Sequence, residues 1–239
     1  MKQLLLIAML IPVLYLVQCK KQETISPYIP VDVTNNDTTP RKNYLALGDS
    51  YTIGQSVATN ERFPAQTVSL LRSMGVLIND PFYVATTGWT TVNLANGIAS
   101  DSLENNYDVV TLLIGVNDQY QTHDTSGYRA RFAALLNTSV TLARGIREHV
   151  VVLSIPDYSV TPFAQYSDTA EIRREIDFFN NINKEVSNEL HCKYLNITDF
   201  TREARYDATL IANDGLHPSG KEYSVWAQQL SQIMFPFLQ

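Results

Sequence analysis

The chain has 239 residues, of which 45% are hydrophobic and 18% are charged, and this composition is ordinary for a globular protein. Its net charge is −6 and it has no cluster of Lys and Arg, which argues against nucleic-acid binding because phosphate neutralisation needs clustered cations. It lacks Cys-x-x-Cys and His-Glu-x-x-His motifs. The sequence therefore has no metal-ligand spacing, and we expect no metal or organic cofactor.

The first 19 residues have the pattern of an export signal. Lys2 is followed by an almost wholly apolar run from Leu4 to Val17, which is short for a membrane span. The run ends at Cys19 in a pattern that resembles the lipobox of bacterial lipoproteins, although Gln18 stands where a small residue is usual. We expect an exported lipoprotein, anchored in a membrane through Cys19 on the periplasmic or cell-surface side of a bacterial envelope. A plain secretory signal and an uncleaved anchor are the alternatives.

Residues 20–41 are rich in Thr, Pro, Asn, Asp and Lys and have no apolar periodicity, so we expect a flexible tether. Residues 42–239 then remain, a length that suits one domain with a sizeable core. The other cysteine of the chain, Cys192, is expected to be a buried structural thiol.

Within the domain, short apolar runs alternate with longer amphipathic stretches. The apolar runs predict strands at 44–47, 82–85, 108–114, 149–155 and 193–195. The amphipathic stretches predict helices at 63–74, 91–103, 126–145, 168–190 and 219–234. The run 108–114 is almost continuously apolar, as expected of a strand that is covered on both faces. This alternation predicts one parallel sheet with helices on both of its faces.

Four short motifs occur in a fixed order along the domain. They are Gly48-Asp49-Ser50, Thr87-Gly88-Trp89, Gly115-Val116-Asn117-Asp118 and Asp214-Gly215-Leu216-His217. The first three follow predicted strands, and sites in parallel sheets form where loops leave the carboxyl ends of strands. Taken singly, each motif is explained as well by a helix cap or a turn.

Together the motifs supply the groups needed for acyl transfer by a serine. The Ser50 hydroxyl is a weak nucleophile until a base takes its proton. His217 can act as that base, and Asp214 can fix the tautomer of its imidazole. The Asn117 amide and the backbone N–H of Gly88 can donate to a developing oxyanion.

In order and placement, the motifs resemble those of the SGNH hydrolases in the GDSL esterase/lipase superfamily. The resemblance covers about residues 43–239 and gives the four family letters to Ser50, Gly88, Asn117 and His217, with Asp214 completing the last block. It implies a flavodoxin-like three-layer α/β/α sandwich with a five-stranded parallel sheet. It also implies an oxyanion hole made by the backbone N–H groups of Ser50 and Gly88 and by the Asn117 amide.

Several residues near these motifs could shape the pocket. Tyr51 stands where the family name has Leu and is expected to alter the pocket floor, and Trp89 is expected to narrow the choice of acyl group. Tyr120, Trp89 and Phe163 lie near predicted loop ends, where they either stack on a sugar, line an acyl slot or simply pack. For Asp118 we expect only a role in local turn structure.

The sequence therefore predicts an ester hydrolase with the catalytic residues Ser50, Asp214 and His217. O-acetylated carbohydrates, lysophospholipids and simple aryl or alkyl esters are all open as substrates, so the expected partners are a small-molecule or glycan ester and a membrane. A non-catalytic, surface-anchored carbohydrate-binding lipoprotein and a structural envelope lipoprotein are the alternatives. Both are disfavoured, because neither needs a paired Asp214 and His217.

Overall fold

The fold is taken from a computed structural model that describes residues 39–123 and 125–239. The expected signal peptide, its Cys19 and residues 20–38 of the expected tether lie outside the described residues. Within the described part of the chain, no helix is both long enough and apolar enough to cross a membrane.

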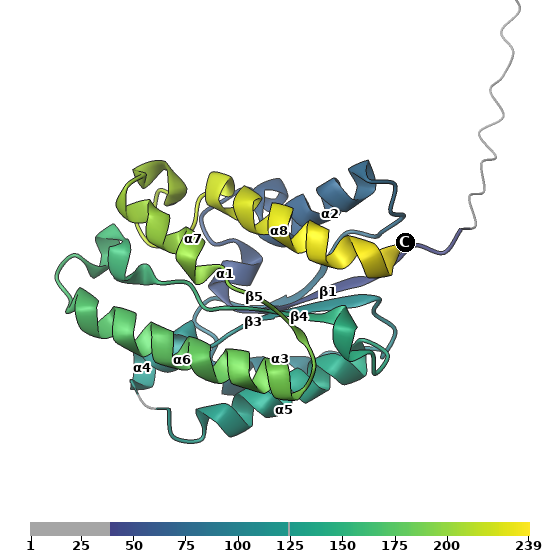
Figure 1. The fold of residues 1–239 in the computed structure, drawn as a ribbon, viewed down its shortest axis with the longest axis horizontal. Coiled ribbons are helices and arrows are strands. Elements are labelled where there is room, and N and C mark those ends of the chain that lie inside the picture. The colour runs from purple at the N-terminus through teal and green to yellow at the C-terminus, as the bar shows by residue number, and fades with distance from the viewer. Residues whose placement is uncertain (1–38, 124) are drawn as a thin grey trace, which may run out of the picture. The chain divides into compact units, whose positions relative to one another are not determined.

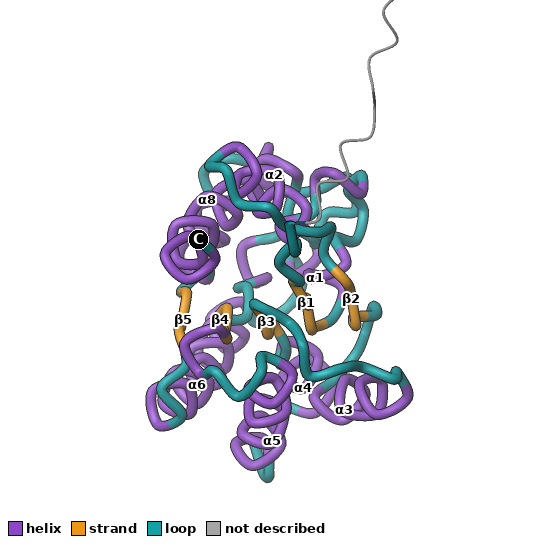
Figure 2. The backbone as a smooth tube through the Cα atoms, turned by 90° about the vertical axis from the view of Figure 1, so that its right-hand side faces the viewer, coloured by secondary structure: helices purple, strands orange, loops and turns teal. Residues whose placement is uncertain are grey.

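The centre of the domain is a parallel sheet in which the strands lie in the order β2-β1-β3-β4-β5 (Figure 2). The strands are β1 (Tyr44–Gly48), β2 (Phe82–Ala85), β3 (Val109–Leu113), β4 (Val150–Leu153) and β5 (Lys193–Leu195). All residues of β1, β3 and β4 are buried, which agrees with the nearly continuous apolar runs of these segments. The predicted five-stranded parallel sheet is confirmed.

Helices cover both faces of the sheet, which gives the expected three-layer α/β/α sandwich (Figure 1). They are α1 (Ser50–Ile53), α2 (Phe63–Ser73), α3 (Thr91–Ser100), α4 (Val116–Thr122), α5 (Tyr128–Leu142), α6 (Thr169–Glu189), α7 (Thr198–Arg202) and α8 (Gly220–Leu238). The helices α2 and α8 pack together on one face, and α3, α5 and α6 lie on the other (Figure 1).

The sequence of α6 explains where this helix begins and which of its faces is buried. Asp168 caps α6 by accepting from the N–H groups of Ala170 and Glu171, and Ile172 and Ile176 begin its buried stripe.

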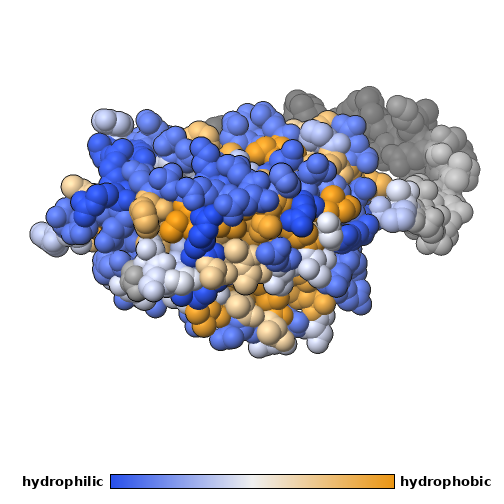
Figure 3. All heavy atoms as spheres, turned by 60° about the horizontal axis from the view of Figure 1, so that its bottom comes forward, coloured by the Kyte–Doolittle hydropathy of each residue, from blue (hydrophilic) through white to orange (hydrophobic). Residues whose placement is uncertain are grey.

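Seen from the side of α3, α5 and α6, the surface mixes polar side chains with apolar patches (Figure 3).

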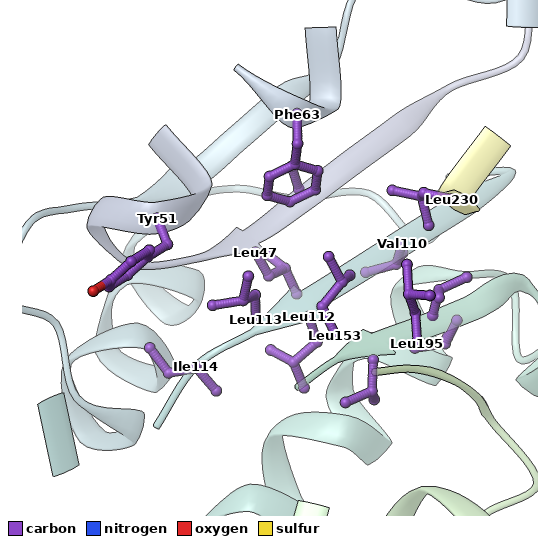
Figure 4. Close-up of a cluster of buried hydrophobic side chains, with 14 of the residues drawn as sticks. Leu47, Tyr51, Phe63, Val110, Leu112, Leu113, Ile114, Leu153, Leu195 and Leu230 are labelled. Carbon is purple, nitrogen blue, oxygen red and sulfur yellow. The ribbon is translucent and has the colours of Figure 1, made fainter. Parts of the chain in front are cut away.

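Strand and helix side chains interlock in one core. Leu47 and Leu112 from the sheet lie in a cluster with Phe63 of α2 and Leu230 of α8 (Figure 4). At the end of β1 a side chain has no room, because a Cβ on Gly48 would lie 2.4 Å from the Leu113 carbonyl oxygen and 2.1 Å from Thr52 Oγ1. Glycine at this position therefore lets β1 end close against β3, next to the nucleophile motif.

The sequence pattern does not predict three short helices that the structure contains. The segments α1, α4 and α7 have four, seven and five residues, too few for a readable apolar period. Cys192 is a buried free thiol, as predicted, and burial raises its pKa to about 11.

Candidate active site

Three strands end level with one another, and this brings three of the four motifs together. In the parallel ladders, Gly48 of β1 is paired with Ala85 of β2 and with Leu113 of β3. Ser50, Gly88 and Asn117 follow these strand ends within a few residues. The three motifs therefore meet at one edge of the sheet, where the fold is expected to place a site.

Ser50 is the first residue of α1 and is held there by its neighbour. The Asp49 side chain caps the helix by accepting from the Tyr51 N–H at 3.0 Å. Burial raises the pKa of the fully buried Asp49 to about 7, although the hydrogen bond from Tyr51 opposes the shift. The nucleophile candidate is itself buried, and the Asp49 cap fixes the backbone at its position.

A chain of hydrogen bonds links Ser50 to the last motif. Ser50 Oγ lies 2.9 Å from His217 Nε2, and His217 Nδ1 lies 2.6 Å from Asp214 Oδ2. Because a carboxylate can only accept, Nδ1 carries the imidazole proton and Nε2 is left to accept from the serine hydroxyl. The buried His217 ring also packs against Tyr51 at a centroid distance of 4.9 Å, and Tyr51 lines the same cavity as Ser50.

Asp214 is held by more groups than the sequence indicated. Its Oδ1 accepts from the backbone N–H groups of Leu216 and His217, and its Oδ2 also accepts from Ser56 Oγ at 2.6 Å. Burial alone would raise the pKa of Asp214, but the hydrogen bonds from Ser56 and His217 outweigh it and hold the pKa well below its usual range. Asp214 is therefore a carboxylate. Ser56 belongs to no motif, so only the structure reveals this contact.

Gly88 and Asn117 face the same cavity as Ser50. Gly88 has φ of +81°, and a Cβ added to it would meet no atom within 4 Å, so its backbone borders open space. The Asn117 amide donates to the Trp89 carbonyl oxygen at 3.1 Å and lies 3.4 Å from Asp49 Oδ2. These contacts orient the amide between the serine motif and the glycine loop.

Asp118 does more than shape a turn, and the expectation of a purely local role is wrong. Its buried carboxylate accepts from the Thr91 N–H at 2.8 Å and from Thr91 Oγ1 at 2.6 Å, and Arg131 lies 3.6 Å away. One turn further along α4, Gln121 donates to the Gly88 carbonyl oxygen at 3.0 Å. Helix α4 therefore carries Asn117 and at the same time fastens the loop that carries Gly88.

The cavity beside these groups has a volume of about 130 Å³. Besides the residues already described, Thr87, Val116, Leu216, Tyr120, Tyr158 and Phe163 line it. Trp89 does not belong to this lining, so it does not narrow the acyl site, and of the alternatives left open for it packing holds. Its indole lies over α3, where a Cβ on Gly97 would come within 2.4 Å of the ring. The lack of a side chain at Gly97 leaves room for the indole at this position.

The remaining histidines have other partners or lie apart from this site. His123 Nδ1 lies 2.9 Å from Glu175 Oε2, and His149 stacks on Phe237 at 4.6 Å. Among residues 39–123 and 125–239, no group of three or more His, Cys, Asp and Glu side chains could hold a metal ion.

Several solved structures share the fold. The acetylxylan esterase Axe2 from Geobacillus stearothermophilus is 20% identical over 81% of this chain and 94% of its own, with a TM-score of 0.63. The esterase EstA from Pseudoalteromonas sp., crystallised with monoethylphosphonate as inhibitor, is 16% identical over 82% of this chain and 98% of its own, also at 0.63. TesA is 17% identical over 82% and 99% of the two chains, with a TM-score of 0.63.

No curated protein sequence matches the chain significantly. Residues 46–225, in contrast, match the family described as GDSL-like lipase/acylhydrolase. This match begins within β1, ends within α8 and spans all four motifs. The chain therefore belongs to the GDSL-like lipase/acylhydrolase family.

Proposed function

We propose that the protein is a serine-dependent hydrolase of O-acyl esters. The observation that carries this proposal is the hydrogen-bonded series from Asp214 through His217 to Ser50, which opens onto a cavity bordered by Gly88 and Asn117. A serine, a base, an orienting carboxylate and oxyanion donors around one hollow are the parts that acyl transfer requires.

In the first half of the reaction, Ser50 Oγ attacks the ester carbonyl carbon while His217 Nε2 takes the hydroxyl proton. The imidazolium that forms is stabilised by the Asp214 carboxylate at Nδ1. The backbone N–H groups of Ser50 and Gly88 and the Asn117 amide stabilise the oxyanion. The tetrahedral intermediate then expels the alcohol, whose oxygen receives the proton from Nε2.

In the second half, a water molecule replaces the alcohol. His217 takes a proton from this water, the hydroxide attacks the acyl carbon, and the same oxyanion donors stabilise the second intermediate. Its collapse releases the carboxylic acid and returns the proton to Ser50 Oγ. No step requires a group beyond the residues named.

A non-catalytic carbohydrate-binding role remains the alternative from a different class. It gives no reason for a buried His217 between a carboxylate and a serine hydroxyl. The similarity to an acetylxylan esterase instead supports carbohydrate O-acetyl esters as one candidate substrate class. Simple esters and lysophospholipids are the other candidates.

Ser50→Ala should abolish ester hydrolysis while the protein stays folded, because the change removes the attacking atom and little volume. Loss of a triad member lowers kcat by several orders of magnitude, roughly 10⁴-fold or more. The measurement is steady-state hydrolysis of p-nitrophenyl acetate, with circular dichroism to check folding. Ser73→Ala is the matched control, because Ser73 is an exposed serine of α2 whose hydroxyl donates to the Leu70 carbonyl oxygen of the same helix. If Ser50→Ala kept more than about a tenth of the wild-type kcat, the proposal would fail.

The oxyanion hole gives a graded prediction. Asn117→Ala should lower kcat roughly 10²–10³-fold with little change in KM, the usual cost of losing one such donor. A rise in KM at constant kcat for Asn117→Ala would make Asn117 a substrate-binding residue instead.

Asp118→Ala should lower kcat as well, because it releases the loop that holds Gly88. It should also lower the free energy of unfolding by about 1–3 kcal/mol, since the buried Thr91 N–H loses its acceptor. Asp118→Asn, which keeps an acceptor oxygen, should recover part of both losses.

We also propose that the protein is exported and anchored by lipid at Cys19. The support is the sequence alone: an apolar segment of signal-peptide length that ends in a lipobox-like pattern, followed by a polar tether. Each buried CH₂ of an acyl chain contributes about 0.8 kcal/mol, so several chains would hold the protein firmly.

Cys19→Ser should therefore release the protein from the membrane fraction or leave an unprocessed precursor. The measurement is fractionation of cells that express the full chain, combined with mass spectrometry of the mature N-terminus. An unmodified Cys19 in the mature wild-type protein, or cleavage at another position, would refute the anchor. The catalytic proposal would survive that result, because none of the groups it uses comes from the segment before residue 42.

A further inference from the structure

Three aromatic rings form one wall of the cavity that contains Ser50. Tyr120 lies on α4, Tyr158 begins a short 3-10 helix (Tyr158–Val160), and Phe163 lies in the next one (Pro162–Ala164). Their ring centroids lie 5.9 to 6.2 Å apart, and each ring contacts the other two at tilted or edge-on angles. These three side chains are called the aromatic wall below.

The wall leaves apolar area uncovered next to the reactive serine. Tyr158 is buried, but Tyr120 remains 50% exposed and Phe163 47% exposed. Large apolar side chains that stay exposed together around a cavity mark a surface that binds a ligand. Because the uncovered rings border the same hollow as Ser50 and His217, the natural occupant is part of the ester itself.

The wall is rigidly connected to the residues proposed to react. Phe163 donates its backbone N–H to the Gly215 carbonyl oxygen at 3.0 Å, within the loop between Asp214 and His217. Tyr120 follows Asn117 by three positions on α4, so both side chains lie on one face of that helix.

The residues behind the wall are also fixed. Buried Asp157 accepts from the Ser159 N–H at 2.9 Å, next to Tyr158, and pairs with Arg202 at 2.8 Å. The rings are thus held in place before a substrate arrives, which reduces the entropy lost on binding.

The proton transfer from His217 to the leaving alcohol indicates which half of the ester contacts the aromatic wall. The alcohol oxygen must lie near His217 Nε2, because it receives its proton from that atom. The segment that carries Phe163 packs directly on the His217 loop, where a Cβ on Gly215 would touch Pro162 at 3.4 Å. Phe163 thus lies next to the loop that carries His217, and its ring contacts that of Tyr120 at 5.9 Å, so the alcohol half is expected to extend toward these two rings.

The lining also restricts the charge of that alcohol. Apart from His217, the described residues that line the cavity include no Asp, Glu, Lys, Arg or His side chain. A phosphate or ammonium group would lose hydration there and find no countercharge. An uncharged ring, in contrast, can place its C–H groups against the electron-rich face of an aromatic side chain.

We infer that the aromatic wall is the subsite for an uncharged ring in the alcohol half of the ester, either a pyranose or an aryl ring. This inference rests on the proposed esterase function and specifies its substrate. It favours acetylated sugars and aryl esters over lysophospholipids, whose alcohol half carries a charged headgroup.

The test compares acetate esters that share the acyl group and differ in the alcohol: ethyl acetate, phenyl acetate and an O-acetylated methyl xyloside. For each enzyme variant, kcat/KM is divided by the wild-type value for the same substrate, which cancels the intrinsic reactivity of the esters. Tyr120→Leu and Phe163→Leu keep apolar volume but remove the ring. Each should lower the value for at least one ring alcohol roughly 3- to 10-fold relative to ethyl acetate, a range typical of one aromatic contact. A fall in relative kcat/KM for phenyl acetate alone identifies an aryl subsite. A fall in relative kcat/KM for the xyloside identifies a sugar subsite.

Two further variants make the comparison specific. Tyr120→Phe keeps the ring and should preserve the preference for ring alcohols. Phe178→Leu is the matched control, because Phe178 is a comparably exposed Phe on α6 that does not line the cavity, and it should not change the preference.

Two results would overturn the inference. One is an equal fall in relative kcat/KM for ethyl acetate and for the esters of ring alcohols in the Leu variants. The other is a loss that follows acyl length in a series of acetyl, butyryl and hexanoyl esters of one alcohol, which would make the wall an acyl slot. Either result leaves the esterase proposal intact as long as Ser50→Ala is inactive on every substrate. If Ser50→Ala is active, the function itself fails.

Discussion

The close parallel pairing of β1 with both of its neighbours is the constraint on which the site depends. Gly48 sits opposite Ala85 and Leu113 at once, so three strands end together and their loops open on the same side. The pairing is tight enough that a Cβ at Gly48 would come within 2.4 Å of the Leu113 carbonyl oxygen. Shifting β1 by one residue would reverse its side chains and move Ser50 away from Asn117. The geometry of the proposed reaction therefore begins in the backbone of the sheet rather than in the catalytic side chains.

The groups around Ser50 are held by contacts that span long stretches of sequence. The bond between His217 and Ser50 joins residues that are 167 positions apart, and Asp118 joins α4 to the start of α3. Ser56 adds a further donor to Asp214 from the segment just after the nucleophile. Such fixed donors and acceptors need no rearrangement when charge develops in a transition state, and this is the property that makes an oxyanion hole effective. The aromatic wall extends the same principle to substrate binding, because its rings are fastened to α4 and to the His217 loop.

Much of this arrangement could be predicted from the sequence, and the failures have physical causes. The five strands were predictable as short apolar runs, and the five long helices as longer amphipathic stretches. The helices α1, α4 and α7 are too short to show an apolar period. The positions of Gly88 and Asn117 followed from strand ends. The partner of Asp118 lies 27 residues away and the partner of Ser56 lies 158 residues away, so neither contact leaves a local signal. Packing could not be selected for Trp89 from the sequence for a similar reason, since it depends on the space above Gly97.

The central claim is that Ser50 is the nucleophile activated by His217, and covalent trapping tests it most directly. The full-length protein would be treated with a p-nitrophenyl alkylphosphonate, digested, and examined by peptide mass spectrometry. Attack by Ser50 Oγ on phosphorus releases p-nitrophenol and leaves a stable phosphonyl ester. We predict one adduct per chain, located on the peptide that contains Ser50, and a large fall in labelling rate in His217→Ala. Labelling of a different residue, or rapid labelling that does not depend on His217, would contradict the account.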